Sequence, residues 1–339
     1  MAESQSVKLV PTPIDFRTIS GQLQELGRGG EGVVYSAASL GKRVYKEFLS
    51  AAYTTPDQAA LDRLIALQSQ WTPEEKVWLT QRTVWPETLV LEQGRLRGFV
   101  MPSIEKQYFR RHGIRQNPKT VLCEWNYLSL RTKFQSNPNI VSEVPRVSPV
   151  DALALVHDLS KTIKLLHKYG VIIGDISGKN LLWTDSPNLQ VMIIDCDSFR
   201  ISGSGGVASP KQSPDWDDPF LNGKPTSQES DIYKLAIAAY RSVWAAGTDR
   251  PQPPSFKLAP KPNGVPDELL SLITRSLAET GRPSAEEWES ILAMPARFRG
   301  RPAIKMGASR SHPVASGPPS QTPIANQRPV INVKVADPD

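Results

Sequence analysis

Two apolar runs in this chain of 339 residues each end at a loop that begins with or holds an aspartate, and this pattern restricts the fold more than any other feature. Residues 171–173 lead into a polar loop with Asp175 and Asn180, and residues 191–194 lead directly into Asp195. A carboxylate in such a loop can orient an attacking hydroxyl and accept its proton, and an amide oxygen beside it can bind Mg²⁺. An apolar strand that ends at an acid can likewise place a ligand for a hard cation.

A lone aspartate behind a strand is usually a turn residue. This chain has two such acids, with Asn180 between them and a glycine-rich segment upstream. Turn formation alone explains this combination less well than it explains a single aspartate. The glycine-rich segment, GRGGEG at residues 27–32, has the spacing G-x-G-x-x-G. Residues 33–35 continue as a strand, whereas a dinucleotide-binding fingerprint needs a helix there. A hairpin whose backbone amides cover a polyphosphate fits better, with a plain flexible turn as the alternative.

Lys46 ends the alternating run 44–46. A lysine that points inward from a strand beside the glycine-rich segment can hold phosphate oxygens as a point charge. For this residue alone, an exposed strand lysine is the simpler explanation. Its place in the order of motifs makes it a candidate.

The composition is that of a globular protein with room for two compact lobes. Hydrophobic residues make up 39% of the chain and charged residues 22%, which argues against wholesale disorder and against a fibrous repeat. No apolar stretch approaches the roughly 18 residues that a bilayer span needs, and the first residues lack a signal-peptide pattern. We therefore expect a cytoplasmic protein with no membrane partner. Cys123 and Cys196 are too few for a disulfide framework or a cysteine-based metal site.

The net charge of +6 is unevenly distributed. Residues 105–147 hold eight Lys or Arg against three Asp or Glu, and residues 297–339 hold seven against two, so these segments carry +10 and the remainder −4. Segregated basic charge favours contact with an anionic partner, although a solvated exposed segment is the simpler explanation. We expect no nucleic-acid partner, because no recognised nucleic-acid module accompanies the basic residues.

Periodicity predicts strands in the first hundred residues and helices in the second half. The strands are expected at residues 23–26, 33–38, 43–48, 88–91 and 96–101, with one helix within 56–71. A helix that starts after Ser148 has an N-cap residue, a proline in its first turn and an acid close behind, and Gly170 follows its last turn. Further helices are expected at 230–247, 267–278 and 284–294, the last with a capping box of Ser284 and Glu287.

In this order, the motifs resemble those of eukaryotic-type protein kinases over residues 20–294. Residues 101–104 resemble the gatekeeper and hinge, Asp231 the buried aspartate of the central helix, and Arg282 the arginine before the last helix. The resemblance implies an α+β fold of two lobes, the first rich in β-structure and the second helical. It divides the chain into an N-terminal extension (1–19), an N-lobe (20–104), a basic insertion (105–147), a C-lobe (148–294) and a Pro/Ser/Arg-rich tail expected to be disordered (295–339).

Carried over residue by residue, the resemblance implies a site for ATP and Mg²⁺, with Mn²⁺ as an alternative metal. Asp175 would position the acceptor hydroxyl, Lys46 would contact the phosphates and Lys179 would reach the γ-phosphate. Asn180 and Asp195 would hold the metal. The implied ATP-binding residues are Gly27, Gly29, Gly30, Gly32, Val34, Val44, Lys46, Met101, Ser103 and Leu182.

Three departures from the family pattern affect the expected site. An Ile-Gly pair at 173–174 replaces the His-Arg before the catalytic aspartate, so activation through a phosphate bound to that arginine is not expected. The usual Asp-Phe-Gly is Asp-Cys-Asp at 195–197. Asp197 would add a metal oxygen or would be the family's aspartate in a shifted register, and the end of the strand favours Asp195. The glutamate that normally pairs with the lysine is absent, and Asp62 is the nearest candidate by spacing.

Four strings are similar to those of an atypical bacterial branch of this superfamily: Gly-Phe-Val-Met-Pro, Gly-Asp-x-x-x-x-Asn, Ile-Asp-Cys-Asp-Ser-Phe and Pro-Asp-Trp. Its members are encoded beside a metal-dependent protein phosphatase and a von Willebrand factor A protein, in triads associated with tellurite resistance. The resemblance implies those two partners and a kinase for serine or threonine, rather than tyrosine, of a protein substrate in a bacterial phosphorylation circuit. A catalytically silent scaffold and a small-molecule phosphotransferase are the alternatives.

Overall fold

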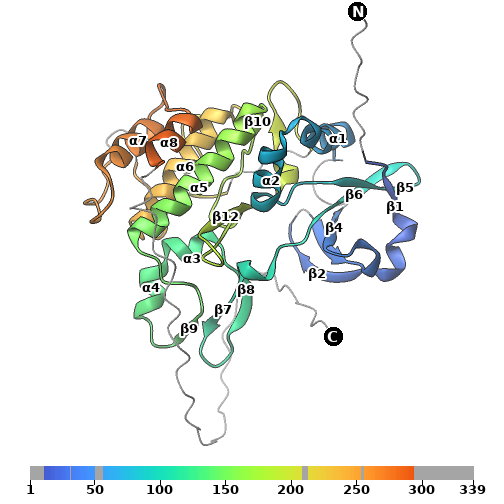
Figure 1. The fold of residues 1–339 in the computed structure, drawn as a ribbon, viewed down its shortest axis with the longest axis horizontal. Coiled ribbons are helices and arrows are strands. Elements are labelled where there is room, and N and C mark those ends of the chain that lie inside the picture. Colours follow the sequence, from blue (N-terminus) through green and yellow to red (C-terminus); the bar gives the residue numbers. More distant parts are fainter. Residues whose placement is uncertain (1–10, 31, 50–55, 208–212, 253–255, 294–339) are drawn as a thin grey trace, which may run out of the picture.

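The computed structural model describes residues 11–30, 32–49, 56–207, 213–252 and 256–293. The disordered tail expected at 295–339 lies outside these residues. The chain has mixed α+β structure, with a β-sheet in its N-terminal region and helices later (Figure 1), which is consistent with a kinase-like fold. Within the described ranges, no helix combines the length and the apolar character needed to cross a membrane.

The N-terminal sheet has six strands in the order β1-β5-β6-β4-β3-β2. They are β1 (Ile14–Asp15), β2 (Gln24–Arg28), β3 (Gly32–Ser36), β4 (Arg43–Phe48), β5 (Thr88–Glu92) and β6 (Arg95–Pro102). The five strands expected from periodicity are present. Strand β1 is a sixth that runs parallel to β5, with Ile14 opposite Val90, so the sheet begins before residue 20.

Strand β4 lies inside this sheet between β3 and β6, which fixes the position of Lys46. Val34 of β3 and Phe99 of β6 lie opposite Lys46 in the two registers. Gly98 allows β6 to approach closely, since a Cβ there would lie 2.1 Å from the carbonyl oxygen of Lys46. Lys46 is only 5% exposed and is therefore an interior residue, not a solvated strand lysine.

The described residues between β4 and β5 include the helices α1 and α2, where periodicity predicts one helix. Helix α1 (Gln58–Leu67) buries an apolar face, as expected. Helix α2 (Pro73–Arg82) begins with a capping box but buries only Leu79 and Arg82. Apolar periodicity does not reveal α2 because so few of its residues are buried.

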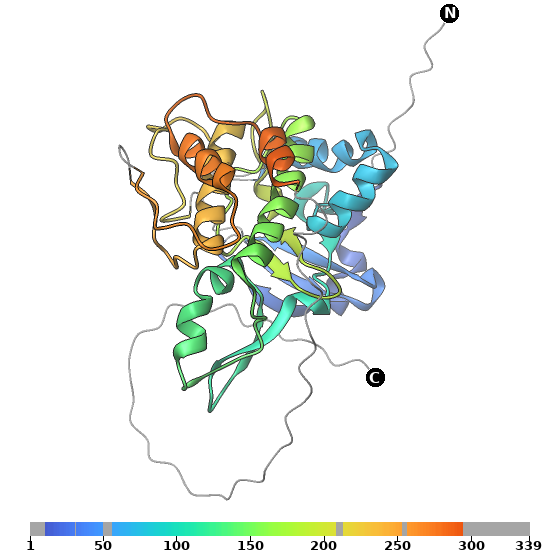
Figure 2. The same cartoon turned by 60° about the vertical axis from the view of Figure 1, so that its left-hand side comes forward.

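Residues 105–147 form a small module with its own sheet. Its elements are β7 (Phe109–Ile114), β8 (Lys119–Leu122), α3 (Trp125–Ser129), α4 (Arg131–Ser136) and β9 (Ile140–Ser142), with antiparallel strands in the order β8-β7-β9. Figures 1 and 2 show this module at one end of the molecule. Trp125 is fully buried and donates from Nε1 to the carbonyl oxygen of Ala238 at 3.1 Å, which anchors the module to the helical part.

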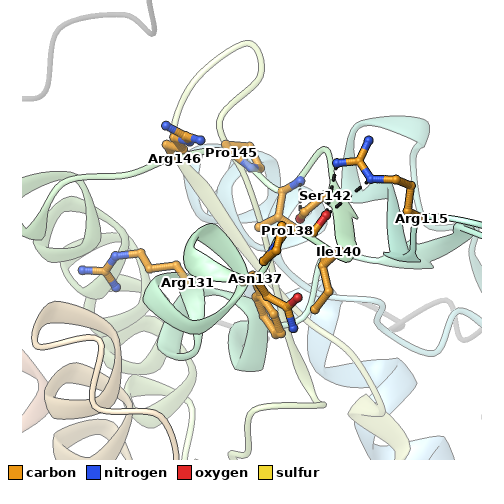
Figure 3. Close-up of a pocket in the computed structure, with 10 residues that line it drawn as sticks. Arg115, Arg131, Asn137, Pro138, Ile140, Ser142, Pro145 and Arg146 are labelled. Atoms are coloured by element: carbon orange, nitrogen blue, oxygen red, sulfur yellow. Dashed lines mark hydrogen bonds between the residues drawn. The ribbon is translucent and has the colours of Figure 1, made fainter.

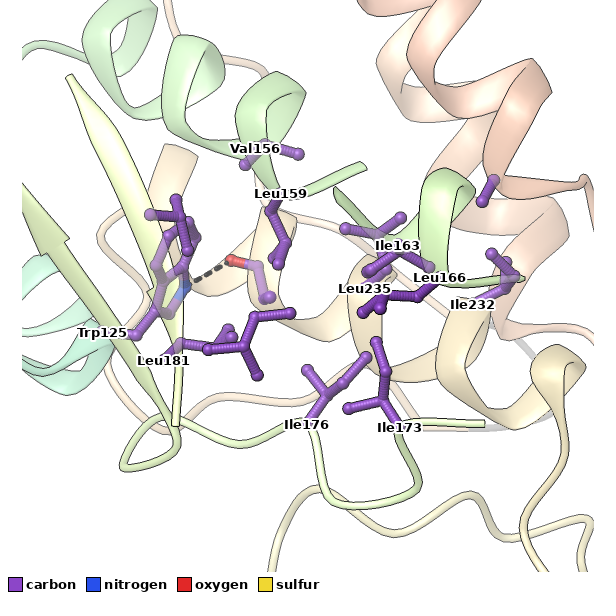
Figure 4. Close-up of a cluster of buried hydrophobic side chains, with 14 of the residues drawn as sticks. Trp125, Val156, Leu159, Ile163, Leu166, Ile173, Ile176, Leu181, Ile232 and Leu235 are labelled. Carbon is purple, nitrogen blue, oxygen red and sulfur yellow. Dashed lines mark hydrogen bonds between the residues drawn. The ribbon is translucent and has the colours of Figure 1, made fainter. Parts of the chain in front are cut away.

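The later part of the chain is built around α5 (Pro149–Lys168) and α6 (Gln228–Val243). Helix α5 begins at the N-cap expected from the sequence and has a full capping box. Figure 4 shows the cluster of buried side chains between these helices, with Leu159 and Ile163 of α5 and Leu235 of α6. Burial of these apolar side chains holds α6 against α5.

Helices α7 (Asp267–Leu277) and α8 (Ala285–Leu292) lie at their expected positions. Ser284 caps α8 by accepting a hydrogen bond from the Glu287 N–H. The Glu287 carboxylate pairs with Arg275, so only the N-cap half of the expected capping box is formed.

Four short strands hold the two polar loops that the sequence singles out. They are β10 (Val171–Ile172), β11 (Leu181–Thr184), β12 (Gln190–Ile193) and β13 (Arg200–Ile201). Strand β10 pairs with β13, and β11 pairs with β12. Leu181 at the start of β11 lies opposite Ile193 at the end of β12. The loop before β11 and the loop after β12 therefore emerge at the same edge.

Candidate active site

Lys46 on β4 forms ion pairs with Asp195 and Asp197, which follow β12. Its ammonium Nζ lies 3.0 Å from Asp195 Oδ1, and 2.8 and 3.0 Å from the two carboxylate oxygens of Asp197. The structure thus brings together Lys46 and Asp195, which the sequence assigns to one site. It also makes Asp197 a direct contact of the lysine.

The backbone after β12 turns so that both acids face Lys46. Asp195 adopts the left-handed conformation with φ 59°, which is uncommon for a residue with a side chain but is tolerated better by Asp than by most others. A 3₁₀ turn, Cys196–Ser198, follows, and the Ser198 N–H donates to the Asp195 carbonyl oxygen at 3.0 Å. The Asp195 side chain is 50% exposed and that of Asp197 only 7%, so the two acids have different access to solvent.

The charges of these three side chains depend on one another. Burial lowers the pKa of the Lys46 ammonium, but the negative charges of Asp195 and Asp197 outweigh it and hold that pKa above its usual range. Burial also raises the pKa of the Asp197 carboxyl, and the charge of Lys46 opposes this. When all three are ionised, one ammonium faces two carboxylates, and the net negative charge favours an added cation.

Asp175 and Asn180 are joined within the loop between β10 and β11. The Asn180 side-chain Nδ2 donates to Asp175 Oδ2 at 2.8 Å and to the Asp175 carbonyl oxygen at 3.0 Å. The other carboxylate oxygen, Oδ1, accepts from the Ser213 N–H at 3.1 Å. The Ile194 N–H donates to the Asn180 carbonyl oxygen at 2.9 Å, which holds this loop beside the residue that precedes Asp195.

Asp231 and Lys234 of α6 hold the backbone that leads to Asp175. Asp231 is fully buried, and its carboxylate accepts from the N–H groups of Ile173 and Gly174, both at 2.8 Å. Lys234, which the sequence analysis does not single out, donates from Nζ to the Gly174 carbonyl oxygen. Burial lowers the pKa of Lys234, and the charge of Asp175 is foremost among those that oppose this. Its position one helical turn after Asp231 is the signal that could have revealed it.

The glycine-rich segment is a hairpin beside Lys46, with residue 31 outside the described ranges. A Cβ at Gly32 would lie 2.6 Å from a backbone carbonyl oxygen of β4 and 3.4 Å from two side-chain carbons of Lys46. The Gly29 N–H donates to the Gly32 carbonyl oxygen at 2.9 Å and closes the turn. Gly27 lies in β2, and Gly30 has open space where a Cβ would be. Gly32 is therefore required by close packing, whereas Gly30 leaves room above the loop.

The apolar candidates for ATP contact lie near one another. Val44 is opposite Met101 in the pairing of β4 with β6, and Met101 packs against the cluster that contains Leu182. The N–H and the hydroxyl of Ser103 donate to the Lys42 carbonyl oxygen at 3.1 and 2.9 Å. Ser103 therefore uses both of its donors within the protein.

Two residues that the sequence assigns to the site, Asp62 and Lys179, are not among the contacts of Lys46 and Asp195 described above. Asp62 lies on α1, and within the described part of the chain no ion pair connects it to Lys46. Asp197 occupies the place beside the ammonium that spacing assigns to Asp62. Lys179 is exposed, and its charge acts on Glu124, whose pKa is raised by burial.

Arg282 pairs with Asp218, a buried residue that the sequence analysis does not single out. Its Nη2 lies 3.0 Å from Asp218 Oδ1, and both side chains are almost fully buried. Asp218 lies in the segment between β13 and α6. The neighbouring Asp217 pairs with Arg250 at 3.0 Å. These two ion pairs hold the segment before α6 against the helical part.

The oxygen donors of the site fit Mg²⁺. Asn180 and Asp195 supply an amide and a carboxylate oxygen, whereas both carboxylate oxygens of Asp197 contact Lys46. Mg²⁺ is usually held by one or two carboxylates together with phosphate oxygens. Across the described ranges, no group of three or more His, Cys, Asp or Glu side chains is placed to hold a metal ion. Because Mg²⁺ uses few protein oxygens and completes its shell with phosphate oxygens and water, these donors fit a cation that is shared with a bound polyphosphate.

A hollow of about 240 Å³ in the module of residues 105–147 is lined by Arg115, Arg131 and Arg146. Figure 3 shows that these three side chains point in different directions. Arg131 donates to backbone carbonyl oxygens, including that of Leu128 at 2.9 Å, and Arg115 donates to that of Pro138 at 3.2 Å. The arginines do not converge on one point, so the hollow is not arranged to hold an anion.

The comparisons with known proteins support a protein-kinase-like family at a distant level. No family model matches the chain. The chain is 23% identical, over 83% of its length, to protein kinase YegI of Escherichia coli strain K12, and 22% identical, over 79% of its length, to protein kinase YegI of Escherichia coli O157:H7. It spans 46% and 44% of these relatives, about half of their length.

Proposed function

We propose that this chain is an ATP- and Mg²⁺-dependent protein kinase that transfers the γ-phosphate to serine or threonine hydroxyls of a protein partner. The main support is the 3.0 Å contact between Lys46 Nζ and Asp195 Oδ1. This contact joins the sheet with the glycine hairpin to the paired loops that contain Asp175 and Asn180. The similarity to proteins named protein kinase agrees with this class of activity.

In this proposal, the residues act mainly by positioning and by neutralising charge, since phosphoryl transfer passes through a loose transition state with spread charge. ATP with Mg²⁺ supplies the γ-phosphate. Asp175 orients the acceptor hydroxyl and takes up its proton as the oxygen bonds to phosphorus and the bond to ADP breaks. Lys46 holds phosphate oxygens, and Asn180 and Asp195 supply oxygen ligands for the metal.

We also propose a polypeptide acceptor and two partner proteins. The segment between β13 and α6 spans residues 202–227, and this length favours a polypeptide acceptor over a small molecule. The resemblance of short strings supports a co-encoded metal-dependent phosphatase and a von Willebrand factor A protein as partners, in a cytoplasmic bacterial circuit. The two lobes of this kinase would be residues 148–294 and the expected N-lobe of residues 20–104, to which β1 (Ile14–Asp15) adds a strand.

The test is transfer of radiolabelled phosphate from ATP in the presence of Mg²⁺, with the protein alone and with each co-encoded partner. We expect label on the protein or on a partner, and a loss of about 100-fold or more in Lys46→Ala, Asp175→Ala and Asp195→Ala. Asp62→Asn is the matched control, because in the described part of the chain the carboxylate of Asp62 forms no ion pair with Lys46.

Label that persists in all three variants contradicts the proposal. ATP binding without transfer to any protein favours the silent scaffold, and label found only on a small metabolite favours the small-molecule phosphotransferase.

A further inference from the structure

Asp197 contacts Lys46 through both of its carboxylate oxygens, at 2.8 and 3.0 Å. The two side chains are only 7% and 6% exposed. An ammonium buried to this degree requires a carboxylate partner, because an unpaired buried charge is strongly unfavourable. We propose that Asp197 is the residue that positions Lys46, in place of a carboxylate from a helix, and that it is not a metal ligand. Its role toward the phosphates rests on the proposed function, whereas the pairing itself does not.

Asp195 and Asp197 differ in their contacts and in their access to solvent. Asp195 meets Lys46 through one oxygen at 3.0 Å, and half of its side chain is exposed, so a cation that arrives with a polyphosphate can reach it. Both oxygens of Asp197 already face the ammonium. A metal ion bound to Asp197 would have to displace Lys46 and would leave that lysine with less compensating charge. This assigns Asp195 to the metal and Asp197 to the lysine.

Among the described residues, the ion pairs of Lys46 go to Asp195 and Asp197 and not to an acid of α1 or α2. Asp57 caps the start of α1. Glu75 in the first turn of α2 pairs with Lys168 at 2.6 Å. Asp62 has no ion pair with Lys46 within the described residues. The lysine therefore takes its partners from the segment after β12 and not from either helix.

This arrangement predicts how the site can be regulated. The partner of the lysine and the proposed metal ligand lie on the same short turn, two residues apart. A displacement of α1 or α2 leaves the pair of Lys46 and Asp197 intact, whereas a displacement of residues 195–197 removes the lysine partner and the metal ligand together. Control of activity by moving a helix carboxylate away from the lysine is therefore not expected.

The first test is a double-mutant cycle on stability, which needs no phosphoryl transfer. Lys46→Met, Asp197→Asn and the double variant are unfolded in urea beside the wild type, and the same cycle is measured with Asp62→Asn as the control. We expect the loss in free energy of unfolding of the Lys46→Met/Asp197→Asn double variant to be clearly smaller than the sum of the losses of the two single variants. In the control cycle with Asp62→Asn, we expect the losses to add. Additivity in the Asp197 cycle, or the same coupling in the Asp62 cycle, overturns the pairing.

The second test separates a lysine partner from a metal ligand by the Mg²⁺ concentration at half-maximal phosphoryl transfer. We expect this concentration to change by no more than about twofold in Asp197→Asn and to rise about tenfold or more in Asp195→Asn. Asp197→Asn should instead lower kcat/KM for ATP about as much as Lys46→Met. An equal rise in the Mg²⁺ requirement of both aspartate variants overturns the assignment. If the wild type transfers no phosphate, Mg²⁺-dependent binding of a fluorescent ATP analogue provides the same comparison.

If the single variant Asp197→Asn does not fold, the double variant of Asp197→Asn with Lys46→Met tests the proposal. Removal of the unmatched ammonium should then restore folding, measured by circular dichroism and by the urea midpoint. A double variant that is as unfolded as Asp197→Asn overturns the proposal.

Discussion

Arg82 at the end of α2 and Asp158 in α5 form a buried ion pair, with Arg82 Nε 3.0 Å from Asp158 Oδ1 and 3.1 Å from Oδ2. Asp158 Oδ2 also accepts the Val191 N–H of β12 at 3.0 Å. Burial raises the pKa of Asp158, and the charge of Arg82 opposes this. One carboxylate therefore joins a helix of the N-terminal region, a helix of the later part and the strand that leads to Asp195.

Arg82→Met is expected to lower the free energy of unfolding by about 3–5 kcal/mol, because Asp158 then stays buried without its counter-charge. Urea unfolding followed by circular dichroism measures this loss. Arg17→Ala is the control, since it breaks an exposed pair with Asp15 and should have little effect. Equal effects of the two substitutions would show that burial does not strengthen the inner pair.

Lys234→Met is expected to lower the kcat of the proposed phosphoryl transfer by about tenfold, because Nζ no longer holds the Gly174 carbonyl group next to Asp175. The measurement is kcat at saturating ATP, with circular dichroism to verify folding. Lys168→Met, which removes an exposed lysine from its ion pair with Glu75, should leave kcat unchanged. A folded Lys234→Met variant with wild-type kcat would rule out this support of the loop.

Gly98→Ala is expected to destabilise the protein by about 1–3 kcal/mol, since the added Cβ would overlap the Lys46 carbonyl oxygen and push β6 away from β4. Gly21→Ala is the matched control, because no atom lies within 4 Å of its added Cβ. The measurement is the difference in Tm between the two variants. The close approach of β6 and β4 would be disproved if both variants melted at the same temperature.

Stability is expected to decline at alkaline pH, in part because of Cys123. Burial raises the pKa of the Cys123 thiol from 9.0 to about 12. Since the folded pKa is the higher one, the contribution of this thiol is complete below about pH 9 and is lost as pH rises toward 12. Urea unfolding at a series of pH values should therefore show a shallower decline in Cys123→Ala than in the wild type. Identical slopes would indicate that the thiol reaches water in the folded protein.

The parts of the fold that could be predicted are those with strong local signals. Helix α5 combines an N-cap, a proline in the first turn and a regular apolar stripe, so its start follows from the sequence. Periodicity does not predict helix α2, because one of its two buried residues, Arg82, is charged and has its partner far along the chain in Asp158. The sheet of β7, β8 and β9 was missed for a similar reason, since pairing between distant short strands leaves little trace in local periodicity.

The residues of the candidate site also differ in how far local sequence signals reveal their positions. The loop positions of Asp175, Asn180 and Asp195 could be predicted, because apolar runs lead into these loops. The role of Asp197 depends on the left-handed conformation of Asp195, which no spacing reveals. Spacing favoured Asp62 because it lies on the first helix after β4, but spacing does not show which way a side chain points.

The short pairing of β1 with β5 has a consequence for handling the protein. Ile14 and Asp15 occupy the outer side of β5, and without them the N–H and C=O groups of that strand would be open along its edge. A shortened version that starts after residue 15 would therefore present a bare template for β-pairing between molecules. Such a shortened protein would be expected to self-associate when it is concentrated, because β1 no longer covers the edge of β5.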